Sequence, residues 1–447
     1  SGRSPMNQSH EPEQGAARRL AMLCCLFAAL GCTKADPAQF KLNMEGLDPA
    51  EFTASGRTDE ALTERVAATE KEIADLQASD PESSRIESLE EQLSGLQNEQ
   101  TNNAKAKGLV DIKIALNALF GTPDEPFVVK ELQTQPDNPD VGFDVAKLRR
   151  AAGPVSSLED GTQIGLYRQH CVHCHGVTGD GVGPTAAFLA PYPRDFRKGV
   201  FKFTSTNESA KPTKEDLKRT LKQGIAGTAM PSFALLPEAD LDALVEYVKY
   251  LSLRGEMEAA LFELVKAGDE VPMTHEDLLG ELQPYSEMWD TAAAEIITPE
   301  APPELDEAGF LASIEEGRKL YQDAKAQCVQ CHGPTGLGYG AEKRFDVWNE
   351  GKTDANLAFF TLPKQPLMPR NLRTGVYRGG RRPVDLYRRI QAGIKGAQMP
   401  SMGQTPAKPS GLTPTEIWSL VHYVQSLPYE AISETGATQQ SVQRDLN

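Results

Sequence analysis

Two short runs of cysteine and histidine share one spacing, although they lie far apart in the chain. Residues 171–175 read Cys-Val-His-Cys-His, and residues 328–332 read Cys-Val-Gln-Cys-His. C-x-x-C-H is the attachment signature of a c-type haem. The spacing brings both thiols to one edge of the macrocycle, where they form thioethers to its vinyl groups, and the adjacent histidine binds the iron. The pattern predicts haem attachment and iron ligation by six residues: Cys171, Cys174, His175, Cys328, Cys331 and His332.

Other sites use paired cysteines at the same spacing. A C-x-x-C pair can be a thioredoxin-like redox motif or half of a zinc site, and the four cysteines together could form one four-thiolate zinc site. Each run here is followed by a glycine-rich loop, at 176–181 and at 333–338. Because the run and its loop are repeated together, the duplication favours haem over zinc and over thiol redox chemistry.

The two runs begin a longer internal repeat. The segment 193–201 is echoed by 369–377, and the Gly-x-x-Gly-x-x-Met-Pro-Ser sequence of 224–232 returns at 393–401. Each copy closes with apolar residues at steps of three and four, which is the pattern of an amphipathic helix.

The order of elements in each copy, from C-x-x-C-H through a glycine loop and a Met-Pro loop to a closing helix, resembles the class I cytochrome c domain. The resemblance covers about 160–254 and 310–428 and implies an all-α fold. In that family a methionine of the late loop is the second iron ligand, a role that falls to Met230 and Met399. A soft thioether opposite an imidazole favours ferrous iron and raises the reduction potential. Three alternatives remain in the second copy: Met368, Met402 and, for a bis-histidine haem, His422.

The resemblance also implies a hydrogen bond behind the iron-binding histidine. In the family, the carbonyl of a proline after the haem motif accepts a bond from the imidazole N–H and so orients the ring. Pro184 matches that position in the first copy. The second copy has glycines and a tyrosine at 338–340 and no proline, which puts the contact in doubt there.

The amino end carries a pattern of export. Arg18 and Arg19 precede an apolar run, 20–32, that ends in Ala-Leu-Gly-Cys. The run is short for a membrane span, and its end resembles the lipobox of a bacterial lipoprotein signal. The resemblance implies that Cys32 is lipidated and becomes the first residue of a protein tethered to a membrane. An ordinary secretory signal and an uncleaved anchor are the alternatives.

Between the leader and the first haem motif, one stretch has helical periodicity. Apolar residues recur at steps of three and four over 62–76 and 86–96, and a proline at 81 separates the two halves. An antiparallel helical hairpin that serves as a stalk or docking element fits this pattern better than an intermolecular coiled coil, which needs more heptads. Residues 33 to about 55 indicate a loose spacer, and 120–160, with several Pro and Gly, an extended connector.

The domain organisation that we predict has six parts. They are a leader at 1–32, a spacer with the helical hairpin at 33–159, the first cytochrome c domain at 160–254, an acidic helical linker at 255–309, the second cytochrome c domain at 310–428 and a flexible tail at 429–447.

Charge is distributed unevenly along the 447 residues, whose net charge is −17. The two repeat copies are basic: residues 161–254 hold 12 basic and 9 acidic side chains, and residues 320–428 hold 14 basic and 7 acidic ones. The stretch between them, 255–319, is strongly acidic, with 3 basic and 17 acidic side chains. The second copy contains a cluster of arginines, at 370, 373, 378, 381, 382, 388 and 389. We expect several of them to pair with haem propionates and with the acidic linker; an acidic redox partner is the alternative. An exported haem protein does not meet nucleic acid, so no such partner is expected.

Together these patterns predict a membrane-tethered cytochrome with two covalently attached haem c groups. It would relay single electrons at the periplasmic side of the cytoplasmic membrane, with a redox protein or a membrane respiratory complex as partner. Irons with both a histidine and a methionine ligand leave no open position for a substrate, so we do not expect an enzyme. The alternative is a dihaem cytochrome c peroxidase-like enzyme, which needs an iron with an open or displaceable position.

Overall fold

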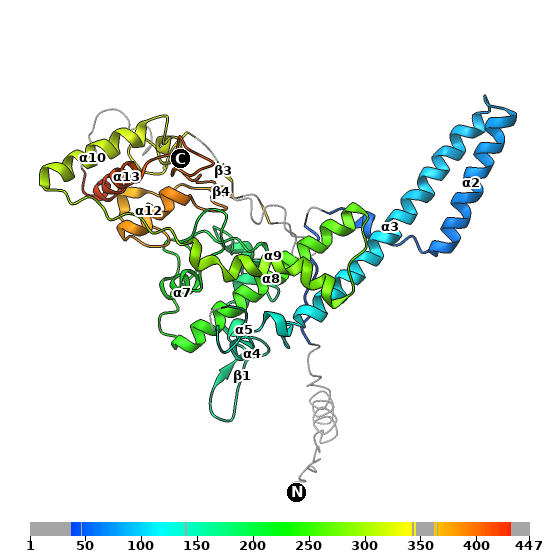
Figure 1. Ribbon diagram of the computed structural model, residues 1–447, viewed down its shortest axis with the longest axis horizontal. Coiled ribbons are helices and arrows are strands. Elements are labelled where there is room, and N and C mark those ends of the chain that lie inside the picture. The colour runs from blue at the N-terminus through cyan, green and yellow to red at the C-terminus, as the bar shows by residue number, and fades with distance from the viewer. Residues whose placement is uncertain are drawn as a thin grey trace, which may run out of the picture. The chain divides into compact units, whose positions relative to one another are not determined.

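The computed structural model describes residues 37–45, 47–138, 141–341, 344–345, 362–363 and 365–430. The chain divides into the unit Ser1–Gln39 and the compact unit Phe40–Asn447, and the second unit holds the helices and strands described below (Figure 1). The leader with Cys32 and the tail beyond residue 430 lie outside the described residues. Within the described part of the chain, no helix has the length and apolar character that crossing a bilayer requires.

The described fold is built mainly of helices. The α-helices are α2 (Asp59–Ser79), α3 (Ser84–Phe120), α4 (Val145–Ala151), α5 (Leu166–His170), α6 (Val172–His175), α7 (Lys214–Gln223), α8 (Glu238–Ala267), α9 (His275–Asp290), α10 (Glu307–Gln322), α11 (Cys328–His332), α12 (Pro383–Ala392) and α13 (Pro414–Ser426). The 3-10 turns are η1 (Pro49–Phe52), η2 (Lys130–Leu132), η3 (Ala186–Phe188), η4 (Phe196–Lys198), η5 (Ala292–Glu295), η6 (Leu372–Thr374) and η7 (Leu427–Tyr429). The predicted all-α fold class is confirmed.

In the described part of the chain, four strands of two residues each form two antiparallel ribbons. They are β1 (Ser156–Ser157), β2 (Gln163–Ile164), β3 (Arg344–Phe345) and β4 (Pro366–Leu367). Ser156 pairs with Ile164, and Arg344 pairs with Leu367. The first ribbon closes the short loop 158–162, and strands of two residues are too short to form a layer of the fold.

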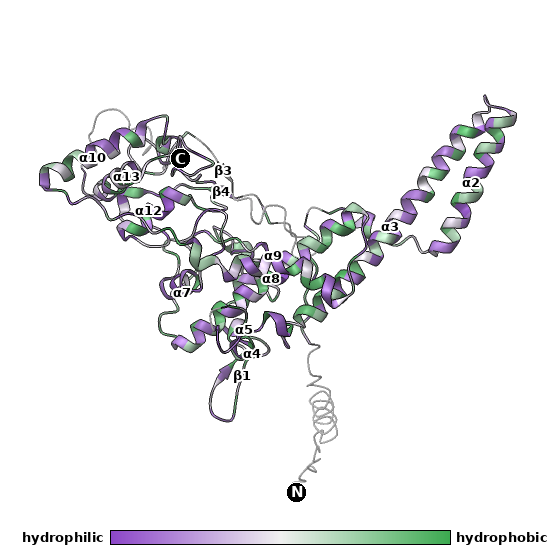
Figure 2. Cartoon of the chain, in the orientation of Figure 1, coloured by the Kyte–Doolittle hydropathy of each residue, from purple (hydrophilic) through white to green (hydrophobic). Residues whose placement is uncertain are grey.

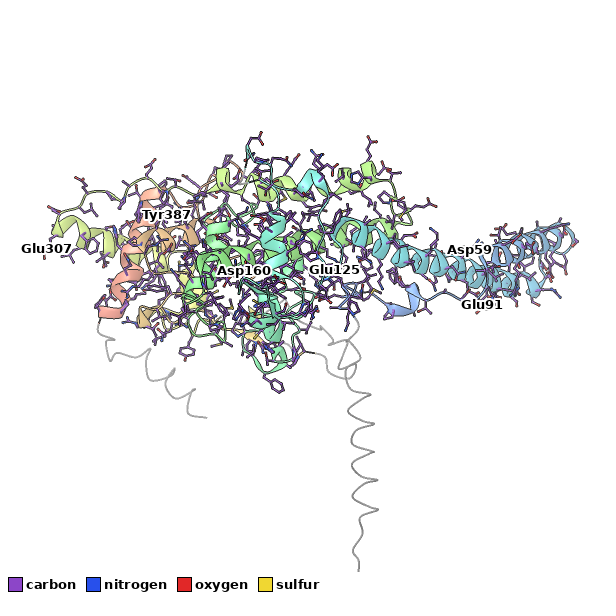
Figure 3. The ribbon with its side chains drawn as sticks, turned by 90° about the horizontal axis from the view of Figure 1, so that it is seen from below. Asp59, Glu91, Glu125, Asp160, Glu307 and Tyr387 are labelled. Atoms are coloured by element: carbon purple, nitrogen blue, oxygen red, sulfur yellow. The ribbon has the colours of Figure 1, made fainter. Side chains whose placement is uncertain are left out.

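The helical hairpin predicted over 60–100 is present as α2 and α3, which pack against each other. The Thr58 side chain caps the start of α2 by accepting a hydrogen bond from a first-turn N–H. Charged residues such as Asp59 and Glu91 are exposed on the hairpin (Figure 3). Its buried apolar residues form one narrow row: Leu62, Ile73, Leu89 and Leu96.

α3 continues well beyond the predicted hairpin and ends at Gly121, whose φ is 67°. The polar stretch 97–107 interrupts the apolar period but contains no proline, so the sequence pattern ends there while the helix does not. The hydropathy colours follow this change, from mainly hydrophilic in the hairpin to more hydrophobic near α8 (Figure 2). The last turns of α3 supply buried residues to the main core: Ile112, Leu116, Leu119 and Phe120.

α8 is the centre of the first core. It contains the closing helix predicted for the first cytochrome c domain and continues for about three more turns into the acidic stretch 255–309. Met257, Leu261 and Val265 of this continuation are buried. Within the acidic stretch, α8 runs to Ala267 and α9 spans His275–Asp290, and both helices supply residues to the core of the first domain.

Two segments expected to be loose are folded against α8. Phe40 and Phe52 of the presumed spacer are buried, and the guanidinium of Arg254 lies 4.0 Å from the centre of the Phe40 ring. Arg254 and Glu258 form a buried ion pair of 2.7 Å. The extended connector expected at 120–160 instead buries apolar residues in the same core: Val128, Val129, Phe143 and Leu148. Their apolar side chains follow no helical or strand period, so sequence periodicity could not show their burial.

The second core forms where α10 crosses α13. Thr413 and Glu416 make a capping box at the start of α13. Gly317 lies at the crossing, where a Cβ atom would come within 2.6 Å of the Ser419 carbonyl carbon. Next to it, the rings of Tyr321 and Tyr423 meet edge to face, with centroids 5.3 Å apart. A residue without a side chain is thus what lets the two helices approach closely.

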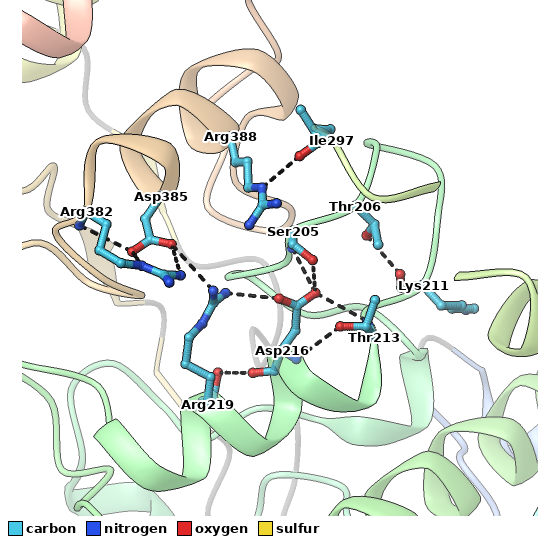
Figure 4. Close-up of polar contacts among 11 residues, drawn as sticks. Ser205, Thr206, Lys211, Thr213, Asp216, Arg219, Ile297, Arg382, Asp385 and Arg388 are labelled. Atoms are coloured by element: carbon cyan, nitrogen blue, oxygen red, sulfur yellow. Dashed lines mark hydrogen bonds and ion pairs between the residues drawn. The ribbon is translucent and has the colours of Figure 1, made fainter. Parts of the chain in front are cut away.

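Polar contacts join α7 of the first domain to α12 of the second (Figure 4). Asp216 caps α7 and accepts hydrogen bonds from Ser205. Arg219 lies 3.0 Å from Asp216 and 3.4 Å from Asp385 on α12. Asp385 pairs in turn with Arg382 at 2.8 Å. The two carboxylates and two guanidiniums form one alternating row across the boundary between the domains.

Candidate haem-binding sites

The first C-x-x-C-H run starts at Cys171, which joins the short helices α5 and α6, and its other four residues form α6. The Tyr167 hydroxyl donates 2.9 Å to the Gly176 carbonyl and so holds the chain that follows the run. The Nδ1 atom of His175 lies 2.9 Å from the Arg194 carbonyl oxygen. A carbonyl can only accept, so Nδ1 carries the proton and Nε2 keeps its lone pair for a metal. Burial lowers the pKa of His175 to about 4, which keeps the ring neutral.

The second run repeats this arrangement on α11. The Nδ1 atom of His332 lies 3.1 Å from the Arg370 carbonyl oxygen, and burial lowers the pKa of His332. The Tyr321 hydroxyl donates 2.8 Å to the Gly333 carbonyl, as Tyr167 does to Gly176 in the first copy. Both histidines are therefore held in the tautomer that a metal ligand needs.

The role predicted for Pro184 is wrong. Pro184 is exposed, because the chain turns back tightly after the haem motif through hydrogen bonds from Gly181 N to His175 O and from Gly183 N to Cys174 O. The chain returns to the histidine only at 193–194. There the Arg194 carbonyl accepts the bond, and the contact doubted in the second copy is made by the equivalent Arg370. The repeated Pro-Arg pairs, at 193–194 and 369–370, were the sequence signal for these acceptors.

The methionine loops also have one geometry in both copies. A tight turn after α7 is closed by a 3.1 Å hydrogen bond from Ile225 N to Met230 O, and the turn after α12 by a 2.9 Å bond from Ile394 N to Met399 O. Each turn starts with a glycine whose φ is positive, 64° at Gly224 and 71° at Gly393. A Cβ at residue 224 would lie 2.8 Å from the Met230 carbonyl oxygen, so only glycine allows this turn.

The eight predicted haem-binding and iron-ligating residues line two cavities, four residues in each. The space not filled by atoms, counted together with the open solvent at each mouth, is about 1350 Å³ in the first cavity and about 1880 Å³ in the second. The remaining walls are largely aliphatic and aromatic. The first is lined by Cys171, Cys174, His175 and Met230, and the second by Cys328, Cys331, His332 and Met399. Two thiols, a neutral imidazole and a thioether around an apolar space are the groups that hold a haem c.

The alternative ligands in the second domain differ in position. Met368 and Met402 line the second cavity together with Met399. Only Met399 occupies the turn that corresponds to the Met230 turn. His422 lies outside the cavity lining, where its Nδ1 atom is 2.9 Å from the Ser313 hydroxyl and its ring packs on Phe310. The bis-histidine alternative therefore lacks support from the geometry.

The alternative chemistries for the cysteines do not fit. The two pairs line separate cavities, and no group of His, Cys, Asp or Glu side chains in the described residues could hold a metal ion by itself. Burial raises the pKa of the Cys171 and Cys328 thiols to about 12. A redox-active thiol must form the thiolate, whereas burial at these two sites favours the thiol.

The arginine cluster bonds mainly to main-chain carbonyls, a role that we did not anticipate. Arg373 donates to Thr335, Leu427 and Glu430 carbonyls, and Arg388 reaches the acidic stretch through the Ile297 carbonyl. We also did not predict that Lys202, Phe203 and Arg378 would line both cavities. These contacts depend on how the two domains meet, for which the sequence carries no local signal.

Comparison with known families agrees with this chemistry. Residues 160–248 match the family model described as cytochrome c oxidase, cbb3-type, subunit III, and residues 314–428 match the model described as cytochrome c. The chain therefore contains two tandem class I cytochrome c domains, with haem c as the implied cofactor and electron transfer as the implied chemistry.

Similarity to individual proteins is limited. No curated protein matches the chain significantly. Among solved structures, a chain of the reducing HAO-like protein complex of Kuenenia stuttgartiensis is 27% identical, and the match covers 61% of this chain and 97% of that one, with a TM-score of 0.42. At that TM-score no property of the neighbour is carried over to this chain.

Proposed function

We propose that each cavity holds one covalently attached haem c, so that the chain is a dihaem cytochrome that relays single electrons. The observation that carries this proposal is that each cavity is lined by two cysteines, a histidine and a methionine. In both copies a main-chain carbonyl accepts the same hydrogen bond from the histidine, and the same turn precedes the methionine. A haem bound in this way supplies a one-electron iron couple. The cysteines would attach it, and the histidine and methionine of each set would be its axial ligands.

The chain's own groups tune that couple in a definite direction. The Nδ1 hydrogen bonds of His175 and His332 fix the orientation of the two rings as ligands. The thioethers of Met230 and Met399 favour the ferrous state and raise the reduction potential. The apolar cavity walls disfavour the additional charge of ferric iron, and this effect acts in the same direction.

We further propose a relay that is not itself an enzyme and that works at the outer face of the cytoplasmic membrane. The leader pattern that ends at Cys32 supports a lipid anchor there, and a redox protein or a membrane respiratory complex would be the partner. Replacing Cys32 with serine tests the anchor: the variant should no longer take up labelled fatty acid and should leave the membrane fraction. Retention of the label in the variant would refute lipidation at Cys32.

The number of haems and their ligands can be tested together. We expect a haem-to-protein ratio of two and two one-electron steps in a spectroelectrochemical titration. Met230→Leu and Met399→Leu should each remove half of the weak methionine-to-ferric-iron band at the red end of the spectrum. Met402→Leu is the matched control, because Met402 lines the second cavity outside the turn that the two copies share, and it should keep the band.

The same titration separates the relay from the peroxidase-like alternative. A wild-type protein with two low-spin irons and no binding of carbon monoxide supports the relay. A high-spin fraction that grows when one haem is reduced, and that binds carbon monoxide or peroxide, would mean an open iron and would refute it.

A further inference from the structure

The two candidate haem cavities meet at one wall. Lys202 and Phe203 of the first domain and Arg378 of the second line both cavities. Phe203 fits against Gly379, where a Cβ would lie 2.7 Å from the Cβ of Phe203 and where φ is 80°. The Arg389 guanidinium lies 5.8 Å from the centre of the Phe203 ring. Each site is thus completed in part by the other domain.

Arg378 makes the most specific contact across this wall. Its guanidinium donates 3.3 Å to the Ala226 carbonyl and 2.9 Å to the Gly227 carbonyl. Both carbonyls belong to the turn that leads from Gly224 to Met230. Arginine presents several N–H donors in a rigid fork, so one side chain can hold two successive carbonyls in a fixed relation. Burial and the neighbouring Arg370 lower the pKa of Arg378.

Arg370 connects the same turn to the other histidine. Its carbonyl accepts the hydrogen bond from His332 Nδ1 at 3.1 Å. Its own guanidinium reaches Gly227, where a Cβ would lie 2.8 Å from the Nη1 atom of Arg370. The methionine turn of the first site therefore touches two arginines of the second domain, one of which also orients the histidine of the second site.

We propose that Arg378 is a positioning residue that holds the Met230 loop of the first haem site from the second domain. The inference rests on the proposed function, because it takes Met230 as an iron ligand. Without Arg378, the carbonyls of Ala226 and Gly227 would bind water, and the turn would be free to move Met230 away from the iron. The first site would then lose its sixth ligand part of the time, while the second site would keep Met399.

Arg378→Gln tests this role in two backgrounds. With Met399→Leu, only the first site retains a methionine, so the red band reports that site alone. There we expect Arg378→Gln to reduce the band severalfold and to allow carbon monoxide to bind the reduced first haem. With Met230→Leu, the band reports the second site, and Arg378→Gln should leave it unchanged.

The matched control is Arg381→Gln, an exposed arginine of the same loop that lines neither cavity among the described residues. It should leave the band unchanged in both backgrounds. Arg378→Lys keeps the charge without the fork, and we expect a band between those of the wild type and Arg378→Gln. If Arg378→Gln does not fold, the lysine variant decides, and a full band in the Met399→Leu background overturns the proposal.

Two further results would overturn it. One is a full band for Arg378→Gln in the Met399→Leu background. The other is an equal loss of the band in both backgrounds, which would indicate general loosening of the interface. A wild-type protein that lacks the methionine band would refute the proposed function first and this proposal with it, and so the two failures can be told apart.

Discussion

Replacing Gly317 with alanine should force α10 away from α13 and destabilise the second domain. A Cβ at this position would overlap the Ser419 carbonyl oxygen and lie 2.6 Å from the Ser419 carbonyl carbon and 2.8 Å from Tyr423 Cβ. None of these atoms can rotate away, so the helices must separate. Such overpacking costs about 1–3 kcal/mol, and exchanging a helical glycine for alanine returns about 1 kcal/mol. Because the overlap is with rigid atoms of α13, the overpacking cost lies in the upper part of its range, about 2–3 kcal/mol, and the net loss is about 1–2 kcal/mol.

Hydrogen exchange measured by mass spectrometry can assign that loss to the second domain. The amides of α13 should exchange about 5–30-fold faster in Gly317→Ala than in the wild type. Gly280 on α9 is the matched control, because nothing lies within 4 Å of the position that its Cβ would occupy. Gly280→Ala should slow exchange in α9 and leave α13 unchanged. Unchanged or slower exchange of α13 in Gly317→Ala would show that the crossing has room for a methyl group and would refute the steric argument.

Three other perturbations have expected outcomes. Glu258→Gln leaves the buried guanidinium of Arg254 without its ion-pair partner and should lower the free energy of unfolding by about 3 kcal/mol in a denaturant titration; a loss below half of that would contradict the pairing. Tyr321→Phe removes the donor to the buried Gly333 carbonyl and should cost about 1–3 kcal/mol in the same assay. The third concerns Lys395, which donates to the Ala210 carbonyl and whose pKa burial lowers from 10.5 to about 8. Between those two pH values Lys395 is protonated in the unfolded chain and neutral in the folded protein. The free energy of unfolding should therefore rise with pH in this range. Lys395→Met should remove that rise, and an unchanged slope would exclude Lys395 as its source.

Features set by short stretches of sequence were predictable. The C-x-x-C-H runs, the methionine turns and the closing helices are encoded within a few residues each, and the structure places their side chains around two cavities. The hairpin was predictable because a proline and a helical period mark it. Its true length was not, because α3 continues through polar residues that show no period.

The features that were missed depend on main-chain atoms and on contacts between distant segments. The Arg194 and Arg370 carbonyls bind the histidines, and since every residue has a carbonyl, residue type alone cannot identify an acceptor. Pro184 was chosen by analogy, and a tight glycine turn places it on the surface instead. Phe40 and Phe143 are buried in the core although their segments show no periodicity. Their burial depends on the surface that the rest of the folded domain presents to them.

The continuous helix α8 bears on how such a protein can change during evolution. The repeat that defines the first domain stops near residue 254, yet the helix runs on to Ala267, and Met257 and Leu261 of its extension are buried in the same core. A genetic crossover at the end of the repeat would cut through a buried helix and expose an apolar surface. We therefore expect the first domain to be inherited as one block with the segments that pack on α8. The closing helix of the second domain, α13, ends at Ser426, close to the end of its repeat, so the second domain is the part that could be exchanged as a cassette.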